Sequence, residues 1–500
     1  MENRISKLTM PTIALSLMTV VSAVSGLNMA LPKLAVDTGA SSTQLTWIVD
    51  SYTVVFAGLL LIAGALGDKY GRQRALLLGL VVFAAACIFG FFQNDPNYLI
   101  AARILMGVGA AFIMPSTLSV ITTSFPPESR GKAVSVWVGI AGGGAVLGLF
   151  GVAILLEYFP WNSFFMLNLS LAVLAILGCI QVPNSKDEQG HPLDWVGGAL
   201  SVLTVGGFVF GIIEGPERGW DAIETISGLT VGAIALVAFV IVELRSKYPL
   251  LDPRLFKLRG FSSGSLSITL QFFGQFGFIF VGMQYLQFVA KFSPLEAAAH
   301  LLWMPLILLP GSRIAGALSK KVPQKYLGST GLAIFGYALL HFSRLGVDFD
   351  FWYFSIGVML LALGLALCAT PATVAITQAL PTSKQGVASA VNDTAREVGS
   401  AIGIAVLGAA LTEAYKNSME IATKGLPEQM ASKLQSSVAF TKMPAPMGIP
   451  ADRWNHLVAS GLEAFRDGTQ SALTIAGCVA IAGALLILII APSKTAQLEK

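Results

Sequence analysis

The stretch Gly64-Ala-Leu-Gly-Asp-Lys-Tyr-Gly-Arg-Gln-Arg74 joins two long apolar segments of the chain. It combines three glycines, which allow a tight turn, with one acid and three bases. Asp68 is placed to cap the next helix, because an acid stabilises a helix N-terminus. A simple turn between membrane helices would explain the bases, but not the glycines and the acid together. We therefore interpret the stretch as a conformational latch, whose charges can pair differently in two states; its members are Gly64, Gly67, Asp68, Gly71, Arg72 and Arg74.

Composition indicates that most of the chain lies in a membrane. Apolar residues make up 54% of the 500 residues and charged residues only 12%, about half the charge of a typical soluble domain. A bilayer core about 30 Å thick is crossed by about 20 helical residues, and apolar segments this long exclude membrane β-strands. The sequence thus predicts an all-α polytopic membrane protein. Its fourteen predicted spans lie near residues 11–31, 48–67, 75–94, 98–122, 134–156, 163–183, 194–214, 226–244, 264–288, 295–316, 326–344, 352–378, 386–416 and 470–491.

The positions of Lys and Arg predict how the chain crosses the membrane. With a cytoplasmic N-terminus, the inner segments hold most of the 32 basic residues, and the short outer loops hold only Lys33, Arg218, Lys291 and Arg344. Both termini are therefore expected in the cytoplasm, which agrees with an even number of spans. The polar stretch 417–469 is expected to be a long outer connection, parts of which could be amphipathic helix, and it either decorates the surface or gates the outer mouth.

Further motifs surround the latch. Ala30-Leu31-Pro32 ends the first span, Trp47-Ile-Val-Asp50-Ser-Tyr52 opens the second, and Arg103-Ile-Leu-Met-Gly107-Val-Gly109 lies in the fourth. Together with the number of spans, these motifs resemble the major facilitator superfamily, and within it the fourteen-helix drug:proton antiporters of the QacA type. The resemblance extends over essentially the whole chain.

This resemblance implies the major facilitator fold, with six-helix bundles at 1–185 and 261–500 and two inserted helices with a basic linker at 186–260. It also implies a monomer in the inner or plasma membrane that works by alternating access around a midplane site. The expected function is proton-coupled efflux of lipophilic drugs or related amphipathic compounds, with the proton as coupling ion and no cofactor. Export of an endogenous lipid or antibiotic-like metabolite, and uncoupled facilitation, are the alternatives.

Ionisable residues within spans cost about 3 kcal/mol or more each, so they are candidates for proton coupling or for binding a charged substrate. Asp50 lies near the outer end of the second span, where it is either a titrating site or a solvated acid at a helix start. The family pattern makes Arg103, in the fourth span, a cavity residue that adjusts the proton affinity of a nearby acid. The alternative for Arg103 is a structural pair that holds two helices together.

Three charged residues share one face of the thirteenth span: Asp393, Arg396 and Glu397. They form either a proton or cation relay or the start of an amphipathic helix in contact with cytoplasmic water. At 1.5 Å per residue, Glu397 is expected about 16 Å above a helix start near residue 386, close to mid-membrane.

Polar residues among apolar and aromatic ones are expected to line a central cavity, because glutamine avoids lipid and aromatic walls suit apolar drugs. The alternative for the aromatic residues of the ninth span is that they face lipid. The expected lining residues are Ser22, Ser25, Asn28, Gln271, Gln275, Phe276 and Asn392.

Two positions depart from the antiporter pattern. The fifth span has Leu149 after Gly148, where the antiporter motif normally has proline, and the first span has Ala23 where QacA-type exporters carry an acid. The absence of that acid favours neutral, zwitterionic or anionic lipophiles over dications. The small residues of the fifth span are still expected to allow close helix packing; they include Gly139, Gly143, Gly144 and Gly148.

Other functional classes lack support in the sequence. The net charge of +4 is small and dispersed, so no nucleic-acid partner is expected. The four cysteines lie in apolar segments without CxxC or Cys/His spacing, so neither a disulfide scaffold nor a metal site is indicated. No GxxxxGK[ST] motif suggests an ATP-driven pump. No nucleophile–base constellation suggests an enzyme.

Overall fold

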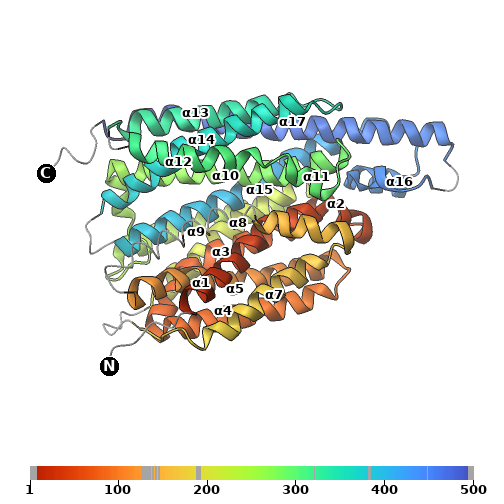
Figure 1. Ribbon diagram of the computed structural model, residues 1–500. Helices are drawn as coiled ribbons and strands as arrows, with labels where there is room; N and C mark the ends of the chain where they lie inside the picture. The colour runs from red at the N-terminus through yellow and green to blue at the C-terminus, as the bar shows by residue number, and fades with distance from the viewer. Residues whose placement is uncertain are drawn as a thin grey trace. The chain divides into compact units, whose positions relative to one another are not determined.

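The computed structural model describes residues 8–125, 137, 140, 144, 147–186, 193–319, 321–380, 385–446 and 449–493, and these residues form helices and no strands (Figure 1). The all-helical fold predicted from the sequence is therefore confirmed. The helices are α1 (Thr9–Ser25), α2 (Leu27–Thr38), α3 (Ser42–Tyr70), α4 (Arg72–Phe91), α5 (Pro96–Ser124), α7 (Ser163–Cys179), α8 (Trp195–Arg218), α9 (Ile223–Arg245), η1 (Pro253–Lys257), α10 (Arg259–Phe288), α11 (Pro294–Ala299), α12 (Trp303–Leu318), α13 (Gln324–Phe342), α14 (Phe351–Gln378), α15 (Gln385–Ala422), α16 (Glu428–Ser436), η3 (Val438–Lys442) and α17 (Ala451–Ile490).

Ten helices in the described ranges are long and apolar enough to cross a membrane, or eleven if α1 and α2 count as one span with a 47° bend. The bend lies at Gly26, between the two helices. The three remaining predicted spans correspond to the apolar helix Leu147–Tyr158, to α7 and to the 19-residue α13. A helix thus lies at each predicted span, although the fifth span is described only in part.

Local sequence signals explain where several helices begin. Asp95 accepts a hydrogen bond from the Asn97 N–H at 2.8 Å before α5, and Asp350 accepts one from the Tyr353 N–H at 2.9 Å before α14. Each acid satisfies an N–H group that has no partner within its helix. Before α11, Ser293 and Glu296 form a reciprocal capping box.

The helices form two compact units. Unit 1 comprises residues 1–33, 47–208 and 228–250, and unit 2 comprises residues 34–46, 209–227 and 251–500. In unit 1, α4 packs against α5 and α7, and α1 packs against α7. In unit 2, α10 packs against α15 and α14, and α13 packs against α14 and α17. Each unit therefore has its own helical core, and candidate sites are described within each unit.

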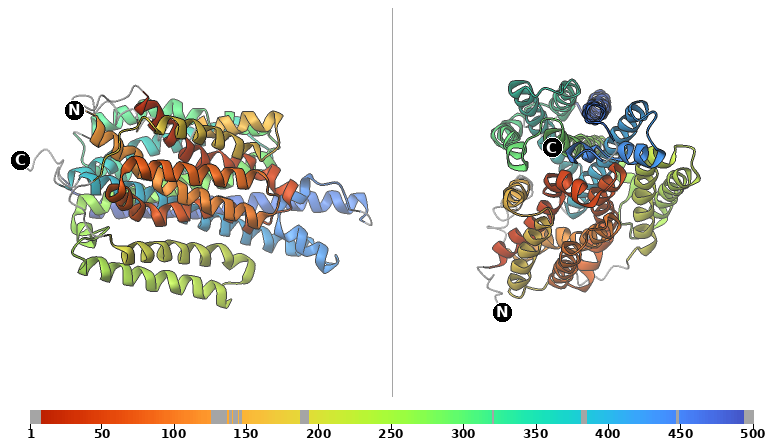
Figure 2. Two further views of the ribbon diagram at one scale, coloured as in Figure 1. Left: turned by 90° about the horizontal axis from the view of Figure 1, so that it is seen from below. Right: turned by 90° about the vertical axis from the view of Figure 1, so that its right-hand side faces the viewer.

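The last two long helices are longer than the predicted spans. α15 has 38 residues and continues to Ala422, and α17 has 40 residues and begins at Ala451. Much of the outer connection 417–469 is therefore helical, since α16 and η3 lie between these two helices. The N-terminal half of α17 extends beyond α13 and α14 (Figures 1 and 2). Its polar residues gave no apolar signal by which the helix start could be found.

Candidate functional site

Asp50 lies inside unit 1 and is not a solvated acid. It stands eight residues after the first residue of α3 and is 0% exposed, which places it about 12 Å along the helix. Neither of its carboxyl oxygens accepts a hydrogen bond from the described residues. Burying a carboxyl group without donors is costly when it is charged, so this position is energetically unusual.

Arg103 lies on α5 and is also 0% exposed. Its Nε donates to the carbonyl oxygen of Ile48 at 2.9 Å, and its Nη2 donates to that of Val49 at 3.3 Å. Its guanidinium carbon lies 4.3 Å from the Tyr52 ring centroid and 5.8 Å from that of Phe164. The guanidinium therefore connects α5 to the backbone of α3 and makes cation–π contacts with aromatic rings of α3 and α7.

The two buried charges of unit 1 interact without direct hydrogen bonding. Arg103 and Asp50 attract each other electrostatically, but the guanidinium donates to α3 carbonyl groups, and the Asp50 oxygens have no hydrogen-bond donor among the described residues. The positive charge thus acts on the acid, while both carboxyl oxygens remain buried and without a donor among the described residues.

Ser22, Ser25 and Asn28, the three residues of α1 and α2 that were expected to line the cavity, are buried. Ser22 donates to the side-chain oxygen of Asn168 on α7 at 2.7 Å. Ser25 donates to the Val21 carbonyl oxygen at 3.1 Å. Asn28 of α2 donates to the carbonyl groups of Val24 and Ser25 at the end of α1, while its Oδ1 has no partner among the described residues. Asn28 is thus the member of this set with unused hydrogen-bonding capacity.

Asn168 was missed by the sequence reasoning. It is 0% exposed, and its amide nitrogen donates to the Phe164 carbonyl oxygen at 2.9 Å while its oxygen accepts from Ser22. A single amide within the apolar run of α7 was the available signal, because such a residue needs a partner inside a membrane. Its partner is 146 positions away in sequence.

The charged residues of α15 form a second candidate site, in unit 2. Arg396 Nη1 lies 3.7 Å from Asp393 Oδ1, and Glu397 is half-buried one position further along. The guanidinium carbon of Arg396 lies 4.7 Å from the Phe272 ring centroid, and Phe272 stacks on Phe276 at 5.7 Å. Two acids, one base and two stacked aromatic rings therefore come together from α10 and α15.

The polar residues beside this cluster differ in their hydrogen bonding. Asn392 is half-buried, and its Oδ1 accepts from Thr373 Oγ1 of α14 at 3.3 Å. Gln271 is 0% exposed and donates to Ser267 at 2.9 Å, and its Oε1 has no partner among the described residues. Gln275 is half-buried on the same helix. Partly accessible amide groups thus accompany the ion pair.

Glycines bring α10 and α15 close together at this cluster. A Cβ atom on Gly399 would lie 2.3 Å from the Thr269 carbonyl oxygen, and one on Gly403 would lie 2.2 Å from that of Phe273. Only glycine permits such an approach of two helix backbones. The contact fixes the level at which the α15 charges lie against the aromatic residues of α10.

The latch is held by an ion pair between the end of α3 and the start of α4. Arg72 Nε lies 2.7 Å from Asp68 Oδ1. The expectation that Asp68 caps α4 is wrong: the cap residue is Gly71, with φ of +117° and no side-chain cap. The carboxylate pairs instead with the guanidinium of Arg72, on the other side of the turn at Gly71. The backbone N–H of Arg72 donates to the Ser185 carbonyl oxygen at 2.9 Å, and thus connects the latch to the segment after α7.

The other latch glycines lie where α3 meets its neighbours. A Cβ on Gly67 would lie 3.2 Å from Ala75 Cβ, and one on Gly64 would lie 3.4 Å from Pro115 of α5. Arg74 is exposed at the start of α4. Tight packing of α3, α4 and α5 therefore surrounds the turn.

The small residues of the fifth span are described only in part. Gly139 and Gly143 lie outside the described residues. A Cβ on Gly148 would lie 2.5 Å from Ser22 Cα, whereas one on Gly144 would keep an ordinary 3.7 Å from Val21. Gly148 thus allows the helix Leu147–Tyr158 to approach α1 closely, near the bend at Gly26.

Similar proteins point to one family. The sequence profile of the Major Facilitator Superfamily matches residues 13–404. The chain is 33% identical over 470 residues to the "Multidrug efflux pump LfrA" of Mycolicibacterium smegmatis, over 92% of this chain and 91% of that protein. It is 32% identical over 477 residues to the "Methyl viologen resistance protein SmvA" of Salmonella typhimurium, over 93% and 92% of the two chains. It is 34% identical over 395 residues to the "Puromycin resistance protein pur8" of Streptomyces alboniger, over 77% and 78%.

Solved structures agree on the fold. A bacterial homologue of the human lysosomal transporter Spinster, inward-facing and occupied, matches with a TM-score of 0.61 at 18% identity over 96% of both chains. The peptide transporter POT in complex with sulfate matches with a TM-score of 0.60 at 16% identity over 97% of this chain and 95% of the other. The family consists of multi-pass membrane transporters and not of enzymes. The chain therefore belongs to the Major Facilitator Superfamily, in its group of fourteen-span multidrug efflux proteins.

Proposed function

We propose that this protein exports lipophilic drugs or related amphipathic compounds by alternating access, driven by proton influx. Both termini would lie in the cytoplasm, and six-helix bundles at 1–185 and 261–500 would flank the inserted segment 186–260. One proton crossing a potential of 100 mV releases about 2.3 kcal/mol, enough to sustain a substantial drug gradient. Relatives named for multidrug efflux and for methyl viologen and puromycin resistance support export of drug-like molecules.

The observation that carries the proposal is the buried carboxyl group of Asp50. It has no hydrogen-bond donor among the described residues and lies within the electrostatic influence of Arg103. An acid in this position is expensive to keep unless its charge changes during the transport cycle. Asp50 would bind a proton in one state and release it in another, and Arg103 would stabilise the deprotonated form.

The α15 cluster would contribute a second charge site. Glu397 and Asp393 are half-buried beside Arg396, so one acid has a direct counter-ion and the other is available to a proton or to a cationic substrate group. The stacked rings of Phe272 and Phe276 offer an apolar wall for aromatic compounds. Position 23 is alanine where QacA-type exporters carry an acid, and Arg396 adds a positive charge. Both features favour neutral, zwitterionic or anionic lipophiles as substrates.

The latch and the glycines would support the conformational change. Asp68 and Arg72 are paired in the present state, and a partly exposed ion pair is weak enough to exchange partners. The close contact at Gly148 would let the fifth span move as one body with α1. Export of an endogenous lipid or antibiotic-like metabolite would use the same parts, whereas an uncoupled facilitator would have no use for a proton site at Asp50.

Reconstituted vesicles provide the test. The protein is sealed into vesicles that contain a pH-sensitive dye, and lipophilic cations, anions and neutral drugs are added in turn. We expect at least one class to evoke proton movement, which Asp50→Asn abolishes. Asp37→Asn, the same change at an exposed position of α2, should leave proton movement intact. If no compound evokes proton movement while labelled substrate still equilibrates, the protein is a facilitator and not an antiporter.

A further inference from the structure

One end of unit 2 projects beyond the membrane-crossing helices. The 40 residues of α17 span about 60 Å, twice the thickness of a bilayer core of about 30 Å. Its C-terminal half is apolar, whereas its N-terminal half carries Asp452, Arg453, Glu463, Arg466 and Asp467. The described residues of 423–470, which we call the projecting segment, are therefore expected to lie outside the hydrocarbon, at the end of α17 opposite Ile490.

The projecting segment is a packed structure. Tyr415 of α15 donates to the Leu434 carbonyl oxygen at 2.9 Å, and Gln435 donates to Thr423, the residue after α15, at 2.7 Å. These two hydrogen bonds connect α16 to the end of α15. On the other side, Phe440 of η3 packs edge-on against Trp454 of α17 at 5.6 Å. Helix α16 and η3 are thus fixed between two long helices, and any cavity between them is preformed.

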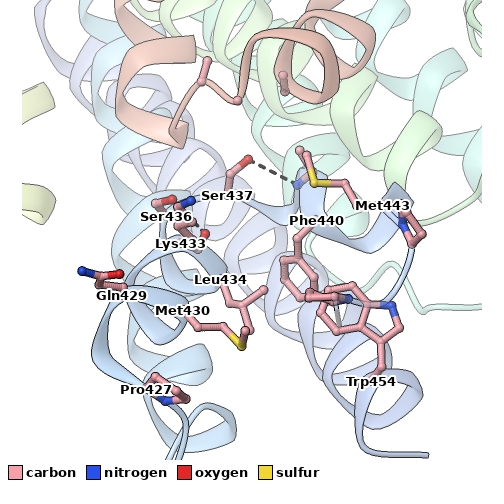
Figure 3. Close-up of a pocket in the computed structure, with 16 residues that line it drawn as sticks. Pro427, Gln429, Met430, Lys433, Leu434, Ser436, Ser437, Phe440, Met443 and Trp454 are labelled. Atoms are coloured by element: carbon pink, nitrogen blue, oxygen red, sulfur yellow. Dashed lines mark hydrogen bonds between the residues drawn. The ribbon is translucent and has the colours of Figure 1, made fainter. Parts of the chain in front are cut away.

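A cavity of about 640 Å³ lies beside this segment, between α16, η3, the start of α17, the last turn of α2 and the residues that follow it. Figure 3 shows the rings of Phe440 and Trp454 beside the side chains of Leu434 and Met430. The described residues that line the cavity include no acid, and Lys433 is their one cation. Lys433 is exposed at the rim, whereas Leu434, Phe440 and Trp454 are buried beneath it.

We propose that this cavity binds a drug-sized lipophilic molecule that carries an anionic group. Its volume lies within the range of about 300–1,000 Å³ of small-molecule sites, and apolar walls with a few polar groups are typical of them. Methionine and aromatic side chains adapt to different apolar bodies, and Lys433 would pair with the negative group at the rim. The ligand is either a free amphiphile or an anionic phospholipid, since both present this chemistry. Binding here does not depend on export.

Two ions of equal shape and opposite charge test the charge requirement. The full-length protein in phosphatidylcholine nanodiscs is titrated with tetraphenylborate or tetraphenylphosphonium, and binding to empty nanodiscs is subtracted. We expect a saturable tetraphenylborate site, besides any at the α15 cluster, for which Lys433→Glu raises Kd about tenfold, the order of effect of a lost charge pair, without weakening tetraphenylphosphonium binding. Lys424→Glu, the same change at an exposed lysine outside the cavity, should alter neither affinity.

A second variant tests the cavity itself. Gln429→Trp adds a bulky side chain at an exposed lining position. It should weaken the binding of both ions, because the ring obstructs the cavity. Native mass spectrometry of the purified protein separates the two ligand sources: an anionic phospholipid retained by the wild type and lost in Lys433→Glu identifies a lipid, and its absence identifies a free amphiphile. The proposal is overturned if the wild type has no saturable site, or if either Lys433→Glu or Gln429→Trp leaves tetraphenylborate binding unchanged.

Discussion

The guanidinium carbon of Arg103 lies 4.3 Å from the centroid of the Tyr52 ring. Tyr52 in turn donates from its hydroxyl group to the Val20 carbonyl oxygen at 3.1 Å, while Arg103 donates to that of Ile48 at 2.9 Å. These contacts join α1, α3 and α5 around the carboxyl group of Asp50. The proposed proton site is therefore held by three helices of unit 1.

Removing the guanidinium should destabilise the protein through the acid it leaves behind. We expect Arg103→Ala to lower the free energy of unfolding by about 3 kcal/mol or more, because a buried charge loses its compensating partner. In Arg103→Ala with Asp50→Asn, the loss should be smaller than the sum of the single losses, since no acid remains to be compensated. Thermal unfolding of the wild type, the two single variants and the double variant in one detergent measures these losses of stability. If the loss of stability in the double variant equals the sum of the two single losses, the two charges are not coupled.

The close approach of α10 and α15 makes Gly403 sensitive to a single methyl group. Its added Cβ would lie 2.2 Å from the Phe273 carbonyl oxygen, so the helices must separate, at a cost of about 1–3 kcal/mol or more. We expect Gly403→Ala to lower the melting temperature and the transport rate. Gly316→Ala, whose Cβ would keep 3.8 Å from Thr370, should do neither. Equal melting temperatures for both variants would rule out the tight contact.

The aromatic face under Arg396 should govern affinity more than speed. Phe272→Leu removes the ring 4.7 Å from the guanidinium but leaves the Arg396–Asp393 pair. Because a cation–π contact contributes about 0.5–2 kcal/mol, we expect KM for aromatic substrates to rise roughly two- to tenfold while the maximal rate changes little. Phe351→Leu, at an exposed position on α14, is the control. A KM unaffected by Phe272→Leu would remove this residue from the substrate site.

Breaking the latch should slow transport without unfolding the protein. The Asp68 side chain is 44% exposed, and a pair of this kind contributes only about 0–1 kcal/mol. We therefore expect Asp68→Asn to leave the melting temperature nearly unchanged and to reduce the transport rate, because the pair would act in one state of the cycle. Asp95→Asn, in which Asn still caps α5, should be neutral in both assays. An unchanged rate in Asp68→Asn would show that the pair is only structural.

The membrane helices were predictable because about 20 apolar residues leave a signal in any single sequence. A polar helix end leaves no such apolar signal. Helix α17, for example, begins at Ala451, about twenty residues before its predicted span. The bend at Gly26 likewise escaped prediction, because it arises where a neighbouring helix approaches closely at Gly148.

The candidate charges were visible in the sequence, since ionisable residues are rare within spans. Their partners were not. The contact between Ser22 and Asn168 joins residues 146 positions apart, and the placement of Arg396 on Phe272 depends on how two helices pack. Such contacts follow from tertiary packing, which local pattern does not encode.

Asp50 is proposed to couple the proton gradient to substrate export. Substrate counterflow, the exchange of labelled for unlabelled substrate without a gradient, needs a working binding site but no net proton movement. In the same vesicles, an imposed pH gradient should drive accumulation in the wild type. We predict that Asp50→Asn retains counterflow and loses gradient-driven accumulation. Accumulation at the wild-type level in Asp50→Asn would contradict the account.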